Sequence, residues 1–473
     1  MSVAQWLEAI AVYAPLWELA ASIELAASQD GPGRRRQVTA AAVLMFEVAS
    51  WETGSYRAAG RAFDDPWLWE RFTAAAAGAW PDHPDRRLPV EAPSRSQHYR
   101  FRSRHLEHDD ALDDLRRLMR DVSALVATTV GMFDPGKGSL SHPVTANLIT
   151  GDATWMPALY NTPGNQPLVD PVTGEVVSRR ADPDAVASHD GSQICGRNLV
   201  TVLARNPGGN ERVILDLAFK PVAGVSDATV ATDMALGLFH QLPAAAGVVY
   251  DMALHAADID RILGRGRLPI SKVQRTRANR VASLNLGVHD FRLSSGANRS
   301  EIVVAVDGTP TITVPTSSGQ YVVPLVRRQL KSRPNSNGTA TVYGTWIVPA
   351  HPVVPRELRS AEVRVRHNST DDELARGKPR TRALRPIPET DADFSRLYGV
   401  REDTESMHHH LKQRLWNGRA RCVGLKRQRI NLHAYQLRTG IAALIAFHYR
   451  TGESIEAWFG AWRPPPSSRA LAA

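Results

Sequence analysis

The alternation of short apolar runs and helical segments between residues 145 and 274 most constrains what this chain can fold into. Three apolar runs come first: NLITGD, NLVTVLAR and RVILDLAFKPVA. A helical segment, DATVATDMALGLFHQL, follows them, and then come a strand, GVVYD, a helix, HAADIDRILGRG, and a last strand, LPISKVQ. Three strands followed by helix, strand, helix and strand predict an α/β sheet with mixed pairing.

The flanking segments predict a helical beginning, a β-rich insertion and a helical end. The first 80 residues are rich in alanine with helical spacing of large apolar residues, and Asp307-Gly308 in the β-rich part is a good hairpin turn. The predicted regions are a helical domain at 1–80, a basic connector and helix at 81–144, the first part of the α/β core at 145–284, a β-rich insertion and linker at 285–390, the core completion and C-terminal helices at 391–460, and a flexible tail at 461–473.

Two segments near the N-terminus leave alternatives open. Residues 52–72 predict two helices around an Asp-Asp-Pro turn, which fits a DNA-binding helix-turn-helix and equally an ordinary hairpin with Trp67, Trp69 and Phe72 in its core. In residues 81–105, arginines alternate with aromatic side chains. That pattern could follow a DNA backbone, and a solvated linker or an edge strand explains it at least as well.

Composition narrows the compartment and the class of partner. The chain carries 57 Lys and Arg against 48 Asp and Glu, a net charge of +9, which suits a polyanionic partner. Its two cysteines, Cys195 and Cys422, are too few for a disulfide framework and predict buried thiols in a reducing compartment. Neither a signal peptide nor an apolar run of membrane-spanning length is recognisable, so we expect a cytoplasmic protein.

The segment LYGVREDTESMHHHLKQRLW at 397–416 places four functional side chains on one helical stripe. Tyr398, Arg401, Glu405 and Lys412 fall at roughly 0°, 300°, 340° and 320° around a helix. An apolar stripe lies beside them, so the helix can rest on a core and present Glu405 at its edge. Taken alone, an ordinary surface salt bridge between Arg401 and Glu405 would explain the same residues.

The spacing Y-x-x-R-x-x-x-E-x-x-x-x-x-x-K, however, matches position for position the signature around the last acid of bacterial insertion-sequence DDE transposases, in the group conventionally numbered four. By this resemblance the fold class is α/β: a ribonuclease H-like mixed-sheet core with a β-rich insertion, an N-terminal helical domain and a C-terminal helical segment. The order of elements along residues 145–274 is also that of a ribonuclease H-like core.

The resemblance implies two further acids, one ending the first core strand and one following the fourth. Asp152 in NLITGDATWM and Asp251 in GVVYDMALHA match those places, so the predicted catalytic and metal-binding set is Asp152, Asp251 and Glu405. Asp216 is a minority alternative to Asp251. Asp307 is better explained as a turn residue, and Asp258 and Asp260 on the following helix are expected to be solvated.

A carboxylate triad of this kind implies two Mg²⁺ ions, with Mn²⁺ able to substitute, because hard oxygen ligands from separate elements suit these ions. By the same resemblance, Tyr398, Arg401 and Lys412 would contact phosphates at the transposon end, a role that suits their side chains. The implied partners are double-stranded DNA at transposon ends and at the target, and a second copy of the chain in a homodimer, in the bacterial cytoplasm at the nucleoid.

Several alternatives remain open. A ribonuclease H-like nuclease without strand transfer would use the same acids, and an inactive or domesticated relative would only bind DNA. The run His408, His409 and His410 cannot chelate one ion together, since consecutive helical residues point in different directions. It predicts a partly basic surface, or one core histidine and two solvated ones. The basic run at 417–433 fits either DNA contact or a solvated face.

Overall fold

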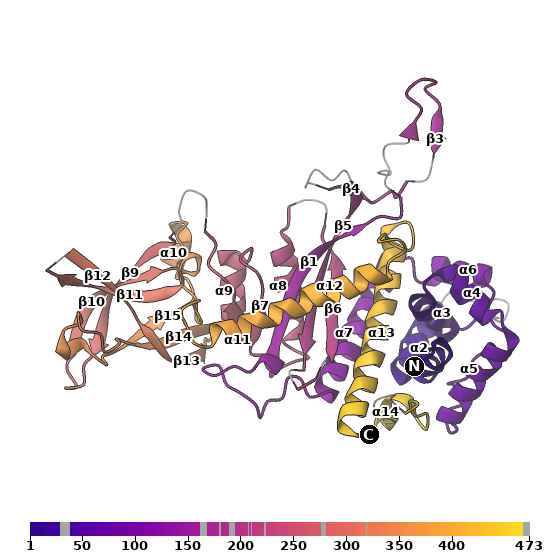
Figure 1. Ribbon diagram of the computed structural model, residues 1–473, viewed down its shortest axis with the longest axis horizontal. Helices are drawn as coiled ribbons and strands as arrows, with labels where there is room; N and C mark the ends of the chain where they lie inside the picture. The colour runs from indigo at the N-terminus through magenta and orange to yellow at the C-terminus, as the bar shows by residue number, and fades with distance from the viewer. Residues whose placement is uncertain are drawn as a thin grey trace.

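The structure is a computed structural model that describes residues 1–28, 38–160, 168–178, 181–188, 194–206, 208–209, 211–221, 224–275, 281–317 and 319–466. Figure 1 shows an elongated molecule with helices at one end, a mixed sheet in the middle and a β-rich unit at the other end. The end of the predicted tail lies outside the described residues. Within those residues, no helix is both long and apolar enough to cross a membrane.

The N-terminal region is helical, as predicted. Its helices are α1 (Val3–Val12), α2 (Ala14–Ser28), α3 (Ala40–Thr53), α4 (Tyr56–Phe63), α5 (Pro66–Ala79), α6 (Arg95–His105) and α7 (Asp109–Thr129). Every residue from Ala40 to Trp51 is buried, so α3 is the central helix of the group. Asp65 caps α5 and Pro66 occupies its first turn, which explains the sharp turn between α4 and α5.

Two expectations for this region were wrong. Trp67 is 60% exposed, while Trp69 and Phe72 are buried as the hairpin interpretation requires. Residues 95–105 form helix α6 with a capping box at Ser94, neither an edge strand nor a linker. The helical pattern was hidden because the inner side of α6 is polar: His98 and Arg102 are buried against the carboxylate of Glu47.

The central sheet has the mixed pairing that the sequence predicted. Its strands are β1 (Leu148–Pro157), β4 (Val186–Ala187), β5 (Cys195–Arg205), β6 (Arg212–Phe219), β7 (Gly247–Val249) and β8 (Leu268–Ile270). The order across the sheet is β6-β5-β1-β7-β8, and β4 pairs with the first two residues of β5. The pairs β6/β5 and β5/β1 are antiparallel, and β1/β7 and β7/β8 are parallel through the crossover helix α9 (Ala256–Gly264). Helix α8 (Asp227–Leu238) connects β6 to β7.

The two faces of this sheet carry different helices. Gly151 lies against Tyr250 and against Ala231 of α8, where an added Cβ would be 3.0 to 3.3 Å from their side chains, closer than ordinary contact. The next residue, Asp152, points to the opposite face, because successive strand residues alternate. On that face it meets α12 (Glu402–Arg414). The sheet therefore separates an apolar face packed by α8 from a polar face covered by α12.

The β-rich unit has a sheet and a core of its own. Its strands are β9 (Ser283–Arg292), β10 (Asn298–Val306), β11 (Thr309–Thr316), β12 (Gly319–Pro324), β13 (Val326–Pro334), β14 (Ala340–Ile347) and β15 (Glu362–Arg366), in the order β12-β11-β10-β9-β15-β14-β13. Asp307 and Gly308 have positive φ angles and form the predicted turn between β10 and β11. The short strands β2 (Leu168–Val169) and β3 (Val176–Ser178), which the sequence did not suggest, project from the body (Figure 1).

The chain ends in helices, as predicted. They are α10 (Asp371–Ala375), α11 (Phe394–Tyr398), α12, α13 (Leu425–Thr451) and α14 (Glu456–Phe459), with the 3₁₀ turn η4 (Gly399–Arg401) between α11 and α12. One hydrophobic cluster joins α13 to the N-terminal helices and to the central sheet, whereas the β-rich unit has a separate cluster around Phe291, Trp346 and Val365. Both cysteines, Cys195 and Cys422, are buried as expected.

Candidate active site

Two of the predicted acids occupy matching places on neighbouring parallel strands. The pairing of β1 with β7 ends at Thr150 and Val249, and Asp152 and Asp251 each lie two residues further along. Asp251 follows the strand directly and accepts a hydrogen bond from the backbone of Ala253 at 2.8 Å. Because parallel strands keep their register, Asp152 and Asp251 lie level with each other along β1 and β7.

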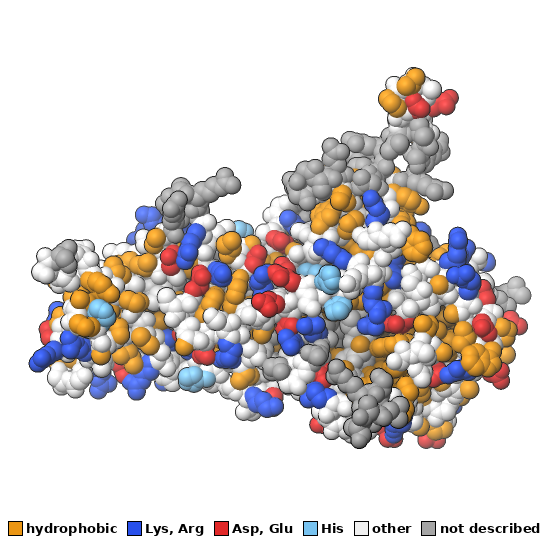
Figure 2. Space-filling model, viewed as in Figure 1, with side chains coloured by type: hydrophobic (Ala, Val, Ile, Leu, Met, Phe, Trp, Pro, Cys, Tyr) orange, Lys and Arg blue, Asp and Glu red, His pale blue; other side chains and the backbone are white. Residues whose placement is uncertain are grey.

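The third acid comes from the helical rod formed by α11, η4 and α12. Gly399, Arg401 and Glu402 all have right-handed helical dihedrals, so the rod continues through the 3₁₀ turn (Figure 1). The side chain of Glu405 is 53% exposed and accepts a hydrogen bond from Arg401 at 2.5 Å. The rod crosses the polar face of the sheet, and Figure 2 shows acidic, basic and histidine side chains gathered there.

The electrostatics of Asp152 join these groups into one site. Burial, with the negative charges of Asp251 and Glu405, raises the pKa of Asp152 from 3.8 to about 6, against the opposing effects of its hydrogen bond from the Ala153 N–H and of the charge of Arg401. Asp251 and Glu405 thus both act on the carboxyl group of Asp152, although the three residues lie far apart in the sequence.

Tyr398 and Lys412 lie at the two ends of this site. Burial raises the pKa of Tyr398, and the charge of Asp251 also raises it, whereas Arg401 lowers it through its charge and a hydrogen bond. The ammonium group of Lys272 stands 5.4 Å from the centre of the Tyr398 ring. Lys412 is exposed, and its charge acts on His408, the residue that contacts Asp152.

The donor set fits a hard divalent cation, since three carboxylates from separate elements offer oxygen ligands only. In this structure the carboxylate of Glu405 faces Arg401. Across the described ranges, no three His, Cys, Asp or Glu side chains are arranged so that they could already hold a metal ion. The guanidinium of Arg401 supplies the positive charge next to Glu405, and it also interacts electrostatically with Asp152.

The competing acids have structural roles. Asp216 is fully buried on β6, where it accepts hydrogen bonds from Arg116 at 2.8 and 2.9 Å and from Arg120 at 2.6 Å. It pairs across the sheet with Val202, which pairs with Gly151, so Asp216 points to the face opposite Asp152. Asp307 accepts a hydrogen bond from the backbone of Ala282 in its turn.

The expectation that Asp258 and Asp260 are solvated was wrong. Asp258 is buried and accepts a hydrogen bond from Thr229 at 3.1 Å. Asp260 accepts from the Ser369 backbone at 2.8 Å and from the Thr381 hydroxyl at 2.9 Å. The two bonds of Asp260 connect α9 to the segment after β15. That segment lies too far along the chain to be recognised as a partner from local sequence.

Sequence reasoning missed the role of His408 at this site. Of the three consecutive histidines, His408 is buried and the other two are exposed, in agreement with the core interpretation. Burial, together with the charge of Lys412, lowers the pKa of His408 to about 4, so the imidazole is neutral at physiological pH. Its partner Thr201 lies on β5 and carried no sequence signal, because it is an ordinary threonine in an apolar strand.

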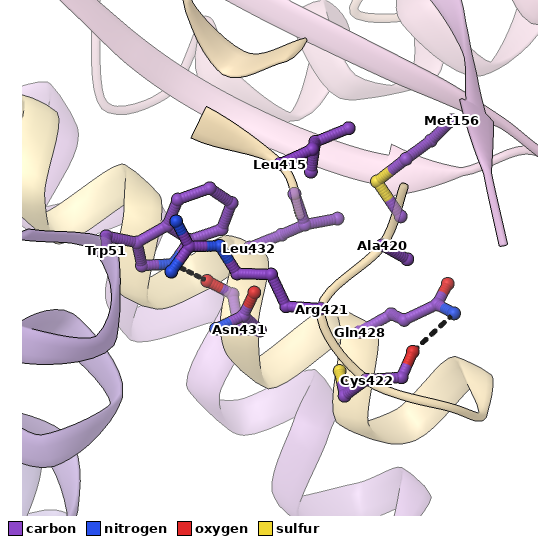
Figure 3. A pocket seen from close by; sticks show the side chains of 9 residues that line it. All are labelled: Trp51, Met156, Leu415, Ala420, Arg421, Cys422, Gln428, Asn431 and Leu432. Atoms are coloured by element: carbon purple, nitrogen blue, oxygen red, sulfur yellow. Dashed lines mark hydrogen bonds between the residues drawn. The ribbon is translucent and has the colours of Figure 1, made fainter. Parts of the chain in front are cut away.

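A small cavity near the C-terminal end of α12 is separate from the acids (Figure 3). Its lining residues are Trp51, Met156, Leu415, Ala420, Arg421, Cys422, Gln428, Asn431 and Leu432. The Arg421 guanidinium lies 4.1 Å from the centre of the Trp51 ring, and Trp51 donates a hydrogen bond to the Asn431 carbonyl at 2.8 Å. These contacts show that the cavity lies where α3 packs against α13.

Comparison with known proteins adds little to this geometry. No family model matches the chain, and no curated protein matches it. Among solved structures, the piggyBac transposase in a synaptic complex with hairpin DNA matches with a TM-score of 0.32 and 10% identity, over 96% of this chain and 77% of that one. A TM-score this low establishes neither a shared fold nor a shared function.

Proposed function

We propose that this chain is a DDE transposase that binds transposon ends and cuts and rejoins DNA with Asp152, Asp251 and Glu405. The observation that carries the proposal is geometric: Asp152 and Asp251 lie in register on β1 and after β7, and α12, the helix of Glu405, packs on β1 with Nδ1 of His408 3.8 Å from Asp152. These residues come from β1, the end of β7 and the rod of α11 and α12, which are the elements that the signature implies.

The central sheet supports a ribonuclease H-like core as its framework. With the short strands β2, β3 and β4 set aside, the core strands in chain order are β1, β5, β6, β7 and β8. The second acid follows the fourth of these strands, as the family resemblance implies, whereas the first lies within the first strand, which continues to Pro157 instead of ending at Asp152. The β-rich unit lies between Asp251 and Glu405 in the sequence, where the family has its insertion.

The residues around the acids are suited to hold a DNA phosphate. Arg401 can offer two parallel N–H groups once it leaves Glu405, Tyr398 can donate one hydrogen bond, and Lys412 supplies an exposed charge. Magnesium held by the three acids would supply the positive charge that activates the attacking oxygen and stabilises the leaving one. In the first step a water oxygen bonds to phosphorus and the bond to the 3′ oxygen breaks. In the joining step that 3′-hydroxyl would attack a phosphate of the target strand: its oxygen bonds to phosphorus, the bond from that phosphorus to the target 3′ oxygen breaks, and the hydroxyl proton passes through solvent to the leaving oxygen.

The N-terminal helices offer a surface for the transposon end. Arg57 and Arg61 on α4 and Arg95, Arg100 and Arg104 on α6 are all exposed. The two helices are neighbours, since Arg95 lies 4.0 Å from where a side chain on Gly60 would begin. Figure 2 shows Lys and Arg side chains over this part of the molecule. A homodimer on paired ends, in the bacterial cytoplasm at the nucleoid, belongs to the same proposal.

The test is Glu405→Gln in the full chain, assayed on plasmid DNA that carries the repeats flanking the gene. We expect cleavage to fall by at least about 10³-fold, because the amide cannot act as an anionic ligand, while binding to the ends stays within about threefold of the wild type. Glu402→Gln, an exposed acid one turn earlier on the same helix, should leave both unchanged.

The same plasmid assay distinguishes the rival functions. Excision with joining supports the transposase, cutting without joining supports a ribonuclease H-like nuclease, and a mobility shift without cutting supports an inactive DNA-binding relative. Normal cleavage by Glu405→Gln would show that the acid is assigned wrongly.

A further inference from the structure

The most informative group that the proposed reaction does not use is His408 of α12, whose side chain faces strands β1 and β5 of the sheet. Its Nε2 is 2.8 Å from the hydroxyl of Thr201, and its Nδ1 is 3.8 Å from Oδ2 of Asp152. Only 5% of His408 and 1% of Thr201 are exposed. Thr201 and Asp152 are direct cross-strand partners, so all three side chains share one face of the sheet.

The tautomer of the neutral His408 imidazole determines which ring nitrogen donates a hydrogen bond and which accepts one. One ring nitrogen carries a proton and the other accepts a hydrogen bond. When the Thr201 hydroxyl donates to Nε2, the proton resides on Nδ1, the nitrogen that faces Asp152. The 3.8 Å separation is longer than a hydrogen bond, so a small rotation of the carboxyl group is needed to complete it.

The position of His408 on its helix links two of the acids. It follows Glu405 by three residues, which places the two side chains on adjacent parts of one helical face. The imidazole contacts the strand of Asp152 while the same helix carries Glu405. His408 thus connects the strand of Asp152 to the helix of Glu405.

We propose that His408, held by Thr201, is a positioning residue that orients the Asp152 carboxylate toward Glu405 so that both can bind one divalent cation. The inference rests on the proposed function, since it requires that these acids bind metal. Partners that hold a ligating carboxylate are worth about 10-fold to 100-fold in metal affinity where this has been measured in metalloproteins.

Two substitutions separate the two ring nitrogens. In His408→Asn the amide lies near the position of Nδ1 and can still donate to Asp152. In His408→Gln the amide reaches the position of Nε2, so it keeps the hydrogen bond with Thr201 but leaves Asp152 without a donor. Thr201→Val removes the hydroxyl that fixes the imidazole proton on Nδ1. His410→Gln, on an exposed histidine of the same helix, is the matched control.

The measurement is binding of Mn²⁺ alone to the full chain, followed by the electron paramagnetic resonance signal of the free ion. We expect His408→Gln to bind Mn²⁺ about 10-fold to 100-fold more weakly than the wild type, Thr201→Val to be intermediate, and His408→Asn and His410→Gln to stay within about threefold. Melting temperatures without metal confirm that each variant is folded, and Mg²⁺ titrations of cleavage should follow the same order.

The possible failures are distinguishable. Equal weakening of Mn²⁺ binding in His408→Asn and His408→Gln, or no weakening in either, overturns the positioning role. If Asp152→Asn still weakens Mn²⁺ binding in that case, the proposed function stands. Wild-type protein that binds no Mn²⁺, or binds it equally well with Asp152→Asn, overturns both the positioning role and the proposed function.

Discussion

Asp152 is held in an environment that opposes its charge. Burial and two neighbouring acids raise its pKa from 3.8 to about 6, so ionised Asp152 destabilises the folded chain when no cation is present. A residue kept in an unfavourable state of this kind is expected at a functional site, where binding of the ligand relieves the strain.

We therefore predict that Asp152→Asn stabilises the metal-free protein. The pKa of Asp152 in the folded chain lies above its value in the unfolded chain. The contribution of this group to the free energy of unfolding is therefore fully present at low pH and is lost as the pH rises from about 4 to about 6. The penalty relieved by the amide is roughly 3 kcal/mol at pH 8 and roughly half of that at pH 5. Thermal melting in a chelator at both pH values measures it. A lower melting temperature for Asp152→Asn at pH 8 would contradict the assignment, and Glu402→Gln should shift it little.

At the scale of elements, Asp216 fastens α7 to the edge strand β6. It is fully buried and bound by Arg116 and Arg120, whose side chains remain 26% and 22% exposed. We expect Asp216→Asn to lower the free energy of unfolding by about 3 kcal/mol, at the low end for a broken buried ion pair because both arginines keep some water. Urea denaturation measures this loss.

The same variant tests the choice between the two candidate second acids. Mn²⁺ binding by folded Asp216→Asn should equal that of the wild type, because Asp216 points to the opposite face from Asp152. Asp251→Asn should instead weaken Mn²⁺ binding without the same loss of stability. The reverse pattern would make Asp216 the metal ligand.

The central sheet was predictable because its strands and helices carry clear apolar patterns. The runs that became β1, β5, β6 and β7 are among the most buried segments of the chain, and α8 and α9 lie where the sequence placed helices. Helix α6 was missed because a buried charge pair replaces its apolar stripe, and β2 to β4 were missed because such short strands have no periodicity.

The site was predictable in one half only. Tyr398, Arg401, Glu405 and Lys412 lie close in sequence, so helical periodicity alone puts them on one side of a rod. The approach of Asp152 to Asp251 depends on the register of β1 with β7, which no local pattern encodes. His408 and Thr201 belong to the site through packing between α12 and β5, so neither could be assigned to it from the sequence.

At the scale of the whole molecule, the N-terminal helices and the central sheet share one hydrophobic cluster. Helix α3, for example, contacts α13, which in turn packs on β6. A DNA end held on α4 and α6 would thus be carried on the same rigid body as the acids. The β-rich unit has its own cluster and reaches the sheet through a smaller one around Leu330, Ile387 and Leu397.

This arrangement leads to a prediction for DNA binding. Arg57 and Arg61 are exposed one turn apart on α4, and within the described part of the chain neither forms an ion pair with a carboxylate. If both contact phosphates, Arg57→Ala with Arg61→Ala should reduce the slope of log K against log salt by about 2, since each B-DNA contact contributes about 0.9.

The measurement is fluorescence anisotropy with a duplex of the transposon end across a range of salt concentrations. The charge-conserving pair Arg57→Lys with Arg61→Lys should keep the wild-type slope, because counterion release depends on charge and not on the geometry of the guanidinium. A slope that is unchanged in the alanine pair would place the end on another surface. A slope that falls equally in the lysine pair would mean that α4 is disturbed structurally, because two retained charges cannot abolish counterion release.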